Sequence, residues 1–305
     1  RLVTDDGLIV TKQNEIMQEQ IKHFGNVLGR KGVFDERKAE AFVSTSDIPQ
    51  LSDDHKLLLE KDICEKELSF ALSKLNNGSS PGSDGLTTRF IKKFWLQLKE
   101  MILESFQNAY LNGEMSFTQT KAVITLIPKG KELPRDNLKN WRPVSLTNID
   151  YKILAKCLAL RLSSVITELV SEDQVGFIKG RKSSNILRMV DDVISLMDDQ
   201  NKPGMLFSLD FSAAFDSVSK EYMTWSFNKF GFGDNFISWV KVLTANTKSC
   251  INYMGWISET FEANSGIRQG CPFSSLAFVL ALELMAIKIR NDQGIKGLRL
   301  PGHDL

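Results

Sequence analysis

Asp210 is the residue in this sequence whose type and position most clearly suggest chemistry. It stands at the end of the apolar run 205–210, in which side chains alternate as they do in a buried strand. A carboxylate at the end of such a strand is unfavourable unless a cation, often a metal ion, lies beside it. Taken alone, the pattern fits an acidic cap on the following helix better than a metal site. The rest of the chain has to decide between these interpretations.

The turn that follows holds two further candidates, Phe215 and Asp216. An isolated Phe is more often a core residue than part of a site, and an Asp ahead of an amphipathic helix is usually its cap. We therefore expect Asp216 to cap the next helix. Phe215 remains a candidate for the same site because it lies five residues after Asp210.

The composition is that of a globular chain. Its 305 residues are 42% hydrophobic and 25% charged, which is enough for two substructures with cores. With 38 basic and 37 acidic residues the net charge is +1, so any basic surface for nucleic acid must be local. The four cysteines are far apart and the three histidines lack ligand spacing, so neither a disulfide framework nor a zinc site is predicted. A reducing, intracellular setting fits best, either nuclear or cytoplasmic.

Neither a membrane span nor a secretory leader is visible in the sequence. No apolar run is long enough to cross a bilayer, so we expect no membrane partner. The chain opens at Arg1, and Pro301-Gly302 near its end is a turn signal that normally leads into another element. We therefore expect the sequence to be a fragment of a longer protein.

Helical periodicity dominates the chain, with a few short strands between the helices. Helices are predicted at 13–29, 63–75, 88–111, 148–169, 220–230, 236–243 and 274–289, and another follows the loop 174–181 and ends near 197. The stretch 31–62 is predicted to be a linker with short helical turns. Strands are predicted at 122–127 and 205–210, with a hairpin at 250–261. Because the strands do not alternate with helices as in βαβ units, the fold class expected is α+β.

Several stretches, in sequence order, resemble motifs of reverse transcriptases. The run from Asp210 to Phe215 resembles the first metal-binding motif, and 266–274 resembles the loop and helix beside the incoming nucleotide. Residues 126–129 and 140–146 are similar to the two fingers motifs that hold the triphosphate. Residues 80–85, 174–177 and 180–181 are similar to the fingers of the LINE-type, non-LTR retrotransposon branch. The resemblance covers about residues 63–300.

The resemblance implies an RNA-directed DNA polymerase that copies retrotransposon RNA into DNA by two-metal nucleotidyl transfer. Asp210 would be catalytic and would bind Mg²⁺, with the carbonyl of Phe211 as a second oxygen ligand. The complete enzyme would use two Mg²⁺ ions, with Mn²⁺ as an alternative. Its partners would be an RNA template, a DNA primer and deoxynucleoside triphosphates. No oligomeric state is implied.

The resemblance also implies roles for residues that surround the nucleotide. The nucleotide would be bound by Lys129, Arg142, Ala213, Ala214, Phe215, Gln269 and Gly270, and the template or primer by Gly176, Arg181 and Pro272. Lys129 and Arg142 would neutralise the triphosphate. The ring of Phe215 would fill the space that a 2′-hydroxyl needs, and Gln269 would hydrogen-bond the sugar or base edge.

In domain terms, the resemblance implies a helical extension or linker at 1–62, right-hand polymerase fingers at 63–200, and an incomplete palm at 201–305. A family polymerase carries an aromatic-Ala-Asp-Asp strand-turn-strand soon after the stretch 294–302, and this sequence reaches Leu305 without one. We therefore expect the chain as given to be inactive. Two alternatives stay open: a degenerate or domesticated relative that binds RNA without polymerising, and a group II intron maturase.

Overall fold

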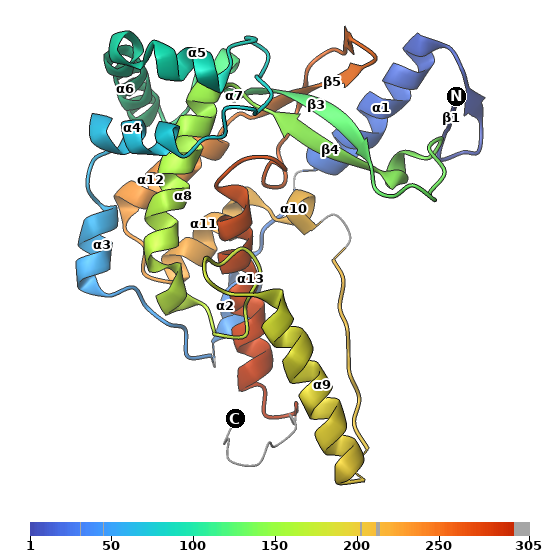
Figure 1. Ribbon diagram of the computed structural model, residues 1–305, viewed down its shortest axis with the longest axis vertical. Coiled ribbons are helices and arrows are strands. Elements are labelled where there is room, and N and C mark those ends of the chain that lie inside the picture. The colour runs from blue at the N-terminus through green and yellow to red at the C-terminus, as the bar shows by residue number, and fades with distance from the viewer. Residues whose placement is uncertain (31, 45, 202, 212–213, 296–305) are drawn as a thin grey trace.

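A mixed β-sheet at one end of the molecule adjoins a helical body built around α8 (Figure 1). The computed structural model describes residues 1–30, 32–44, 46–201, 203–211 and 214–295. This combination of many helices with one mixed sheet agrees with the predicted α+β class. Within the described residues, no helix has both the length and the apolar character needed to cross a membrane.

Most predicted helices form within a few residues of their expected bounds. The helices of the described chain are α1 (Gln13–Leu28), α2 (Glu36–Val43), α3 (Asp53–Leu59), α4 (Glu65–Ser73), α5 (Thr88–Lys93), α6 (Trp95–Asn112), α7 (Phe117–Thr120), α8 (Ile149–Leu169), α9 (Ser183–Asp199), α10 (Ala214–Ser217), α11 (Lys220–Lys229), α12 (Asp234–Thr244) and α13 (Ser274–Asn291). The strands are β1 (Leu2–Val3), β2 (Ile9–Val10), β3 (Lys121–Pro128), β4 (Trp141–Leu146), β5 (Lys248–Tyr253), β6 (Trp256–Ile257) and β7 (Phe261–Glu262), and a 3₁₀ turn covers Leu138–Asn140.

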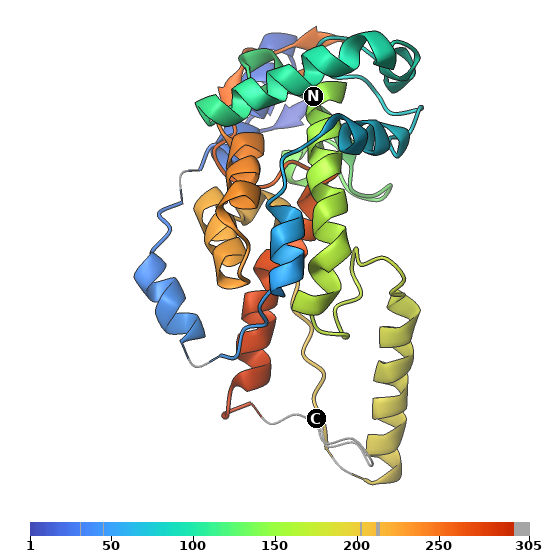
Figure 2. The ribbon, with the colours of Figure 1, turned by 90° about the vertical axis from the view of Figure 1, so that its left-hand side faces the viewer.

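Helix α8 is the centre of the main hydrophobic core. Its residues Ile153, Leu154, Leu158 and Leu162 are fully buried, and it packs against α4, α12 and α13. A helix that is apolar on nearly every face must be surrounded by other elements, as α8 is here (Figures 1 and 2). The helical body is therefore built around α8.

Strand β3 lies in the middle of the larger sheet. It pairs antiparallel with β4 and parallel with β5, and β5 also pairs with β6 and β7. The β3–β4 register places Ile127 opposite Arg142 and Pro128 opposite Trp141. The strand 122–127 and the hairpin of β5 and β6 agree with the sequence prediction, whereas β4 was not predicted, because Pro143 lies within it.

The N-terminal segment packs on this sheet through a second, smaller core. Phe24 and Leu28 of α1 meet Ile124 of β3 and Ile251 of β5, and all four side chains are buried. The backbone N–H of Val3 also donates to the carbonyl of Asp136 at 2.7 Å. The N-terminal segment is thus attached to the sheet through α1 and to the loop between β3 and β4 through β1.

The predicted strand at 205–210 is wrong. Residues 203–211 have no regular secondary structure, and Met205, Phe207 and Leu209 are 87%, 75% and 61% exposed. They run beside α9, which projects from the body (Figures 1 and 2). Alternation of apolar residues determines which face each side chain takes, but a strand forms only where another strand accepts its hydrogen bonds. Within the described residues no strand runs along this segment.

The helix predicted at 88–111 is interrupted. Phe94 ends α5 and precedes α6, with φ −103° and ψ 18°, outside the helical region. The two pieces are tied separately to α4 and the turn after it, because the ammonium of Lys92 donates to the carbonyl of Leu75 at 2.8 Å and the indole N–H of Trp95 to Ser69 at 2.8 Å. Apolar periodicity continues across the break, so the sequence did not reveal it.

We expect Phe24→Ala to lower the free energy of unfolding by about 3–5 kcal/mol, because it empties a site that is only 2% exposed in the smaller core. Phe42→Ala is the matched control, because the Phe42 side chain is 46% exposed. Its effect in chemical denaturation should be several times smaller. Equal losses for the two variants would contradict the packing of α1 against the sheet.

Candidate active site

A large cleft of about 1190 Å³ is lined by six of the twelve predicted site residues. Those that line it are Lys129, Arg142, Asp210, Phe211, Phe215 and Gln269. They come from the β3–β4 strand ends, the segment before α10, α10 itself and the loop 265–270, which are far apart in the sequence. Ala214 and Gly270 adjoin lining residues in the chain, and Ala213 lies outside the described residues.

The β3–β4 ladder positions the two predicted phosphate ligands. Because Ile127 pairs with Arg142, Lys129 follows the ladder at the same end of the two strands. The backbone N–H of Lys129 donates to the carbonyl of Asn140 at 2.8 Å, which closes the loop between them. Both side chains are exposed towards the cleft. Two cationic side chains are thus available to an anion at one end of the cleft.

The loop 265–270 is bonded to α1 and α10. The backbone N–H of Ser265 donates to the carbonyl of Leu28 at 2.8 Å, and the N–H of Ile267 donates to the carbonyl of Phe215 at 2.8 Å. Gly266 has φ +80°, and a Cβ there would lie 2.7 Å from the Cα of Asp216. Only glycine allows this approach without displacing the backbone of α10.

The same loop is bonded on its other side to β4. The backbone N–H of Ser145 donates to the carbonyl of Gln269 at 2.9 Å. Gly270 has φ +98°, and a Cβ there would meet the carbonyl oxygen of Ser145 at 3.0 Å. The loop therefore connects the strand that carries Arg142 to the helix that carries Phe215.

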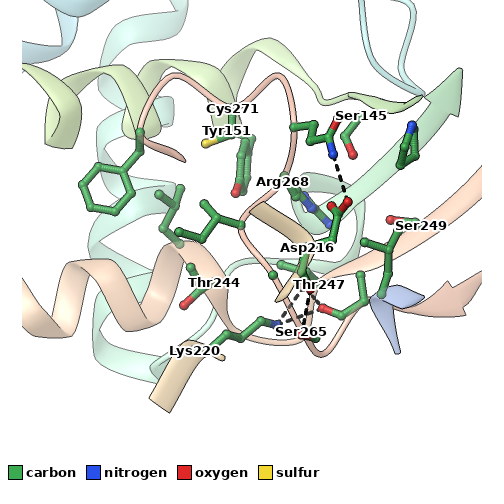
Figure 3. A pocket seen from close by; sticks show the side chains of 18 residues that line it. Ser145, Tyr151, Asp216, Lys220, Thr244, Thr247, Ser249, Ser265, Arg268 and Cys271 are labelled. Carbon is green, nitrogen blue, oxygen red and sulfur yellow. Dashed lines mark hydrogen bonds between the residues drawn. The ribbon is translucent and has the colours of Figure 1, made fainter. Parts of the chain in front are cut away.

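Asp216 is a buried carboxylate beside this loop and does not cap the next helix. Ser219 caps α11, since its hydroxyl accepts from the N–H of Tyr222 at 3.0 Å. The Asp216 side chain instead accepts a hydrogen bond from the amide nitrogen of Gln269 at 2.9 Å (Figure 3). Burial raises the pKa of Asp216 to about 6, although the Gln269 bond and the charge of Lys129 act to lower it.

Asp210 offers an incomplete set of metal ligands. It is exposed and lines the cleft, and the carbonyl of the next residue, Phe211, is a second hard oxygen donor. Among the described residues, no three acidic, histidine or cysteine side chains cluster as a metal site would require. Mg²⁺ is often held by one or two carboxylates, with the other ligands coming from phosphate and water. The donors present fit that partial role.

Phe215 belongs both to the cleft and to an aromatic cluster. Its ring centroid lies 4.9 Å from that of Phe278 and 6.1 Å from that of Phe177. The side chain is half-buried and lines the cleft. Packing against Phe278 of α13 restricts the ring, so its position relative to the cleft is well defined.

Comparison with known proteins agrees with this geometry. Residues 127–298, more than half of the chain, match the family described as reverse transcriptase (RNA-dependent DNA polymerase). The chain belongs to the reverse transcriptase family. The match spans the segments that carry every described residue named above as lining the cleft.

Relatives of this chain come from mobile elements. It is 34% identical over 245 residues to the uncharacterized 149 kDa protein of transposon TX1 from Xenopus laevis, covering 80% of this chain and 18% of that protein. It is 28% identical over 221 residues to the retrovirus-related Pol polyprotein from type-1 retrotransposable element R2 of Popillia japonica, covering 72% and 30%. It is 26% identical over 162 residues to the probable RNA-directed DNA polymerase from transposon BS of Drosophila melanogaster, covering 52% and 18%.

These relatives confirm the LINE-type, non-LTR resemblance. The chain spans less than a third of the length of each of them. Functions of the whole proteins are therefore not carried over directly to this chain.

The residues predicted to bind template or primer lie away from the cleft lining. The Arg181 guanidinium donates to the carbonyl of Gln174 at 2.7 Å and to that of Ser171, so it already bonds the chain just after α8. Gly176 is held by a bond from its N–H to the side chain of Gln174 at 2.9 Å, and Pro272 is partly buried ahead of α13. Their role in binding template or primer stays a prediction.

The turn-rich stretch around Gly82 has a structural explanation. A Cβ on Gly82 would lie 2.4 Å from the backbone nitrogen of Asn148, so the loop packs directly on the start of α8. The ammonium of Lys152 donates to the carbonyl of Ser80 at 2.8 Å. Glycine at position 82 is therefore required by packing, whatever else the loop does.

Sequence reasoning missed one wall of the cleft. This wall consists of Lys22 and His23 of α1, Arg30 just after that helix, and Lys139 from the β3–β4 loop. Burial lowers the pKa of His23; the charge of Asp5 acts to raise it, and those of Lys139 and Lys129 to lower it further. The polar face of α1 was visible as helical spacing, but no sequence signal shows which element a polar face will meet.

A small pocket of about 20 Å³ lies beside the loop 265–270, and two cationic side chains, Lys220 and Arg268, line it (Figure 3). The ammonium of Lys220 donates to the hydroxyl of Thr247 at 2.9 Å, and Arg268 donates to the carbonyl of Lys248 at 3.0 Å. Burial lowers the pKa of Lys220 to about 8, and the nearby charge of Arg268 lowers it too. These bonds tie the loop and α11 to β5 and its flanks.

We expect Gly266→Ala to destabilise the chain more than Gly255→Ala does, by about 1–3 kcal/mol. Both glycines have positive φ, +80° and +88°, but a Cβ at 255 would meet nothing within 4 Å. The backbone strain is therefore shared, and the difference in chemical denaturation isolates the clash with α10. Equal effects would contradict the close approach of loop and helix.

Asp216→Asn should stabilise the folded chain at pH 7.5, by up to about 3 kcal/mol, and much less at pH 4. As pH rises from the ordinary value of 3.8 to about 6, the unfolded chain loses this proton while the folded chain retains it. The wild type thus loses stability across that window, whereas asparagine does not titrate. Unfolding measured at both pH values checks this, and a pH-independent difference would contradict it.

Proposed function

We propose that this chain is the nucleotide- and template-binding part of an RNA-directed DNA polymerase that copies retrotransposon RNA into DNA. The observation that carries the proposal is the convergence of Lys129, Arg142, Asp210, Phe215 and Gln269 on one cleft. The family match over residues 127–298 supports the same reaction class. The substrates would be deoxynucleoside triphosphates, an RNA template and a DNA primer.

In this proposal the triphosphate lies against the end of the β3–β4 ladder. Arg142 can offer a planar pair of donors to phosphate oxygens, and Lys129 adds a compact positive charge. Both side chains are exposed to the cleft, so neither has to leave a buried ion pair before it can bind phosphate. Lys139 and Arg30, on the same cleft, would add positive potential around the phosphates.

Asp210 and the carbonyl of Phe211 would hold Mg²⁺, or Mn²⁺, at the other side of the triphosphate. When bound, the ion supplies positive charge that stabilises the attacking and leaving oxygens of phosphoryl transfer. Asp210 is well suited to this role because its carboxylate is exposed to the cleft and, among the described residues, forms no ion pair. Two ions are proposed for the complete enzyme.

Phe215 would lie under the sugar of the nucleotide. Contacts with Phe278 and Phe177 restrict its ring, so the ring cannot move aside readily to admit a 2′-hydroxyl. A deoxyribose would fit where a ribose clashes.

For the template and primer we propose Gly176, Arg181 and Pro272. The loop that holds Gly176 and Arg181 also carries Phe177, whose ring lies 6.1 Å from that of Phe215, so the loop adjoins a residue of the cleft wall. In this arrangement residues 63–200 form the fingers and 201–305 part of the palm of a right-hand polymerase, with 1–62 as an extension. The packing of α1 against β5 supports an extension that is attached to the polymerase body.

Lys129→Ala and Arg142→Ala should each weaken binding of a deoxynucleoside triphosphate to the full chain by about tenfold or more, because each removes a charge-assisted contact. Isothermal titration calorimetry with Mg²⁺ present measures the change. Lys131→Ala and Arg135→Ala are matched controls, since both side chains are exposed on the same loop but do not line the cleft. If the controls weaken binding as much as the cleft variants do, the proposed triphosphate site is wrong.

Phe215→Val should increase the affinity for a ribonucleoside triphosphate relative to its deoxy counterpart by about tenfold. The smaller side chain leaves room for the 2′-hydroxyl at the cleft edge. Phe42→Val is the control, since the Phe42 side chain is 46% exposed and does not line the cleft. Unchanged discrimination in Phe215→Val would remove this residue from the role.

A further inference from the structure

The contact between Asp216 and Gln269 is unusual because it pairs a buried carboxylate with a neutral amide. Asp216 is 6% exposed, and within the described residues it forms no ion pair. Its carboxylate oxygen lies 2.9 Å from the amide nitrogen of Gln269. Buried carboxylates are usually paired with a cation, so this arrangement is retained at a cost in stability. Such a cost suggests a function other than stabilisation.

The chemistry of the two groups determines how the Gln269 amide is oriented. An ionised carboxylate can only accept hydrogen bonds, so it must face the NH₂ of Gln269 and not the amide oxygen. The backbone that carries this side chain is bonded to β4, since the Gln269 carbonyl accepts from the N–H of Ser145 at 2.9 Å and Gly270 packs against the same strand. The amide oxygen, Oε1, therefore points away from the carboxylate and is the acceptor that Gln269 offers to a ligand.

We propose that Asp216 is a positioning residue that orients Gln269 so that Oε1 accepts a hydrogen bond from the 3′-hydroxyl of the incoming nucleotide. This inference rests on the function proposed above. A triphosphate at neutral pH offers no hydrogen-bond donor to an amide oxygen, whereas the sugar hydroxyl does. Phe215, the proposed sugar contact, is the residue directly before Asp216. The donor would thus lie next to the group that orients its acceptor.

The Gln269 amide should lose its fixed orientation when Asp216 gains a proton. A carboxylic acid can donate to Oε1, so the amide can then flip and exchange its nitrogen and oxygen positions. Asp216 lines both the cleft and the small pocket. The charged side chains that share these linings include Lys129 after β3, Arg142 of β4, His23 of α1, Lys220 of α11, Arg268 of the loop 265–270 and Asp210. With these around it, burial raises the pKa of Asp216 to about 6. The carboxylate form, and with it the fixed amide, predominates at pH 7.5.

The first test needs no nucleotide. In the full chain labelled with ¹⁵N-glutamine, the side-chain amide signal of Gln269, assigned by its loss in Gln269→Ala, should shift with a midpoint near pH 6. Asp216→Asn should abolish that titration, while Asp198→Asn, an exposed site on α9, should leave it unchanged. A Gln269 signal that does not titrate in the wild type would overturn the pair.

The second test compares a deoxynucleoside triphosphate with its 2′,3′-dideoxy analogue, which lacks the donor. At pH 7.5 the wild type should bind the deoxy form about threefold to tenfold more tightly, the worth of one hydrogen bond. Asp216→Asn should reduce this preference towards unity by weakening only the deoxy form. Equal weakening of both ligands would indicate a merely structural role, and a wild type without any preference would refute the proposal.

The two tests also separate this inference from the proposed function. If the wild type binds neither nucleotide, the proposed function fails and the ligand assigned to Gln269 fails with it, whereas the amide titration still decides whether Asp216 orients Gln269. If both nucleotides bind equally well, the function stands and only the 3′-hydroxyl contact is lost. Because Asp216→Asn is expected to stabilise the folded chain, a change in titration or binding in this variant would not be due to unfolding.

Discussion

The hydrogen bonds of the loop 265–270 are the interaction on which the site depends. This loop bonds the end of α1, the backbone of α10 and the strand β4, all within 3.0 Å. Two glycines with positive φ let it approach α10 and β4 closely. Since β4 carries Arg142 and α10 carries Phe215, one short loop determines how far apart the groups at the two sides of the cleft lie.

The rest of the fold keeps that loop and its partners in place. Helix α8 and the main core hold α11, α12 and α13, and α13 continues directly from the loop. The smaller core fixes α1 to the sheet, so that the end of α1 can accept its bond from Ser265. Rigid elements thus carry the loops that line the cleft, an arrangement common to binding and catalytic sites.

Much of this could be predicted from sequence, for reasons visible in particular elements. The periodicity of α1, α8 and α13 reflects packing of a helix face, and the motifs around Arg142, Asp210 and Gln269 indicated residues that the structure brings to one cleft. The segment 205–210 was mistaken for a strand, because pairing depends on a neighbour that local alternation cannot reveal. The contact of Asp216 with Gln269 spans 53 residues and has no local signal.

The central claim is that these separated segments form one nucleotide site. A crystal structure of the chain with a deoxynucleoside triphosphate and Mg²⁺ tests it most directly. The account predicts the phosphates within hydrogen-bonding distance of Lys129 and Arg142, with the sugar between Phe215 and Gln269. A nucleotide bound elsewhere, or a structure in which the loop 265–270 has separated from α10 and β4, would contradict it.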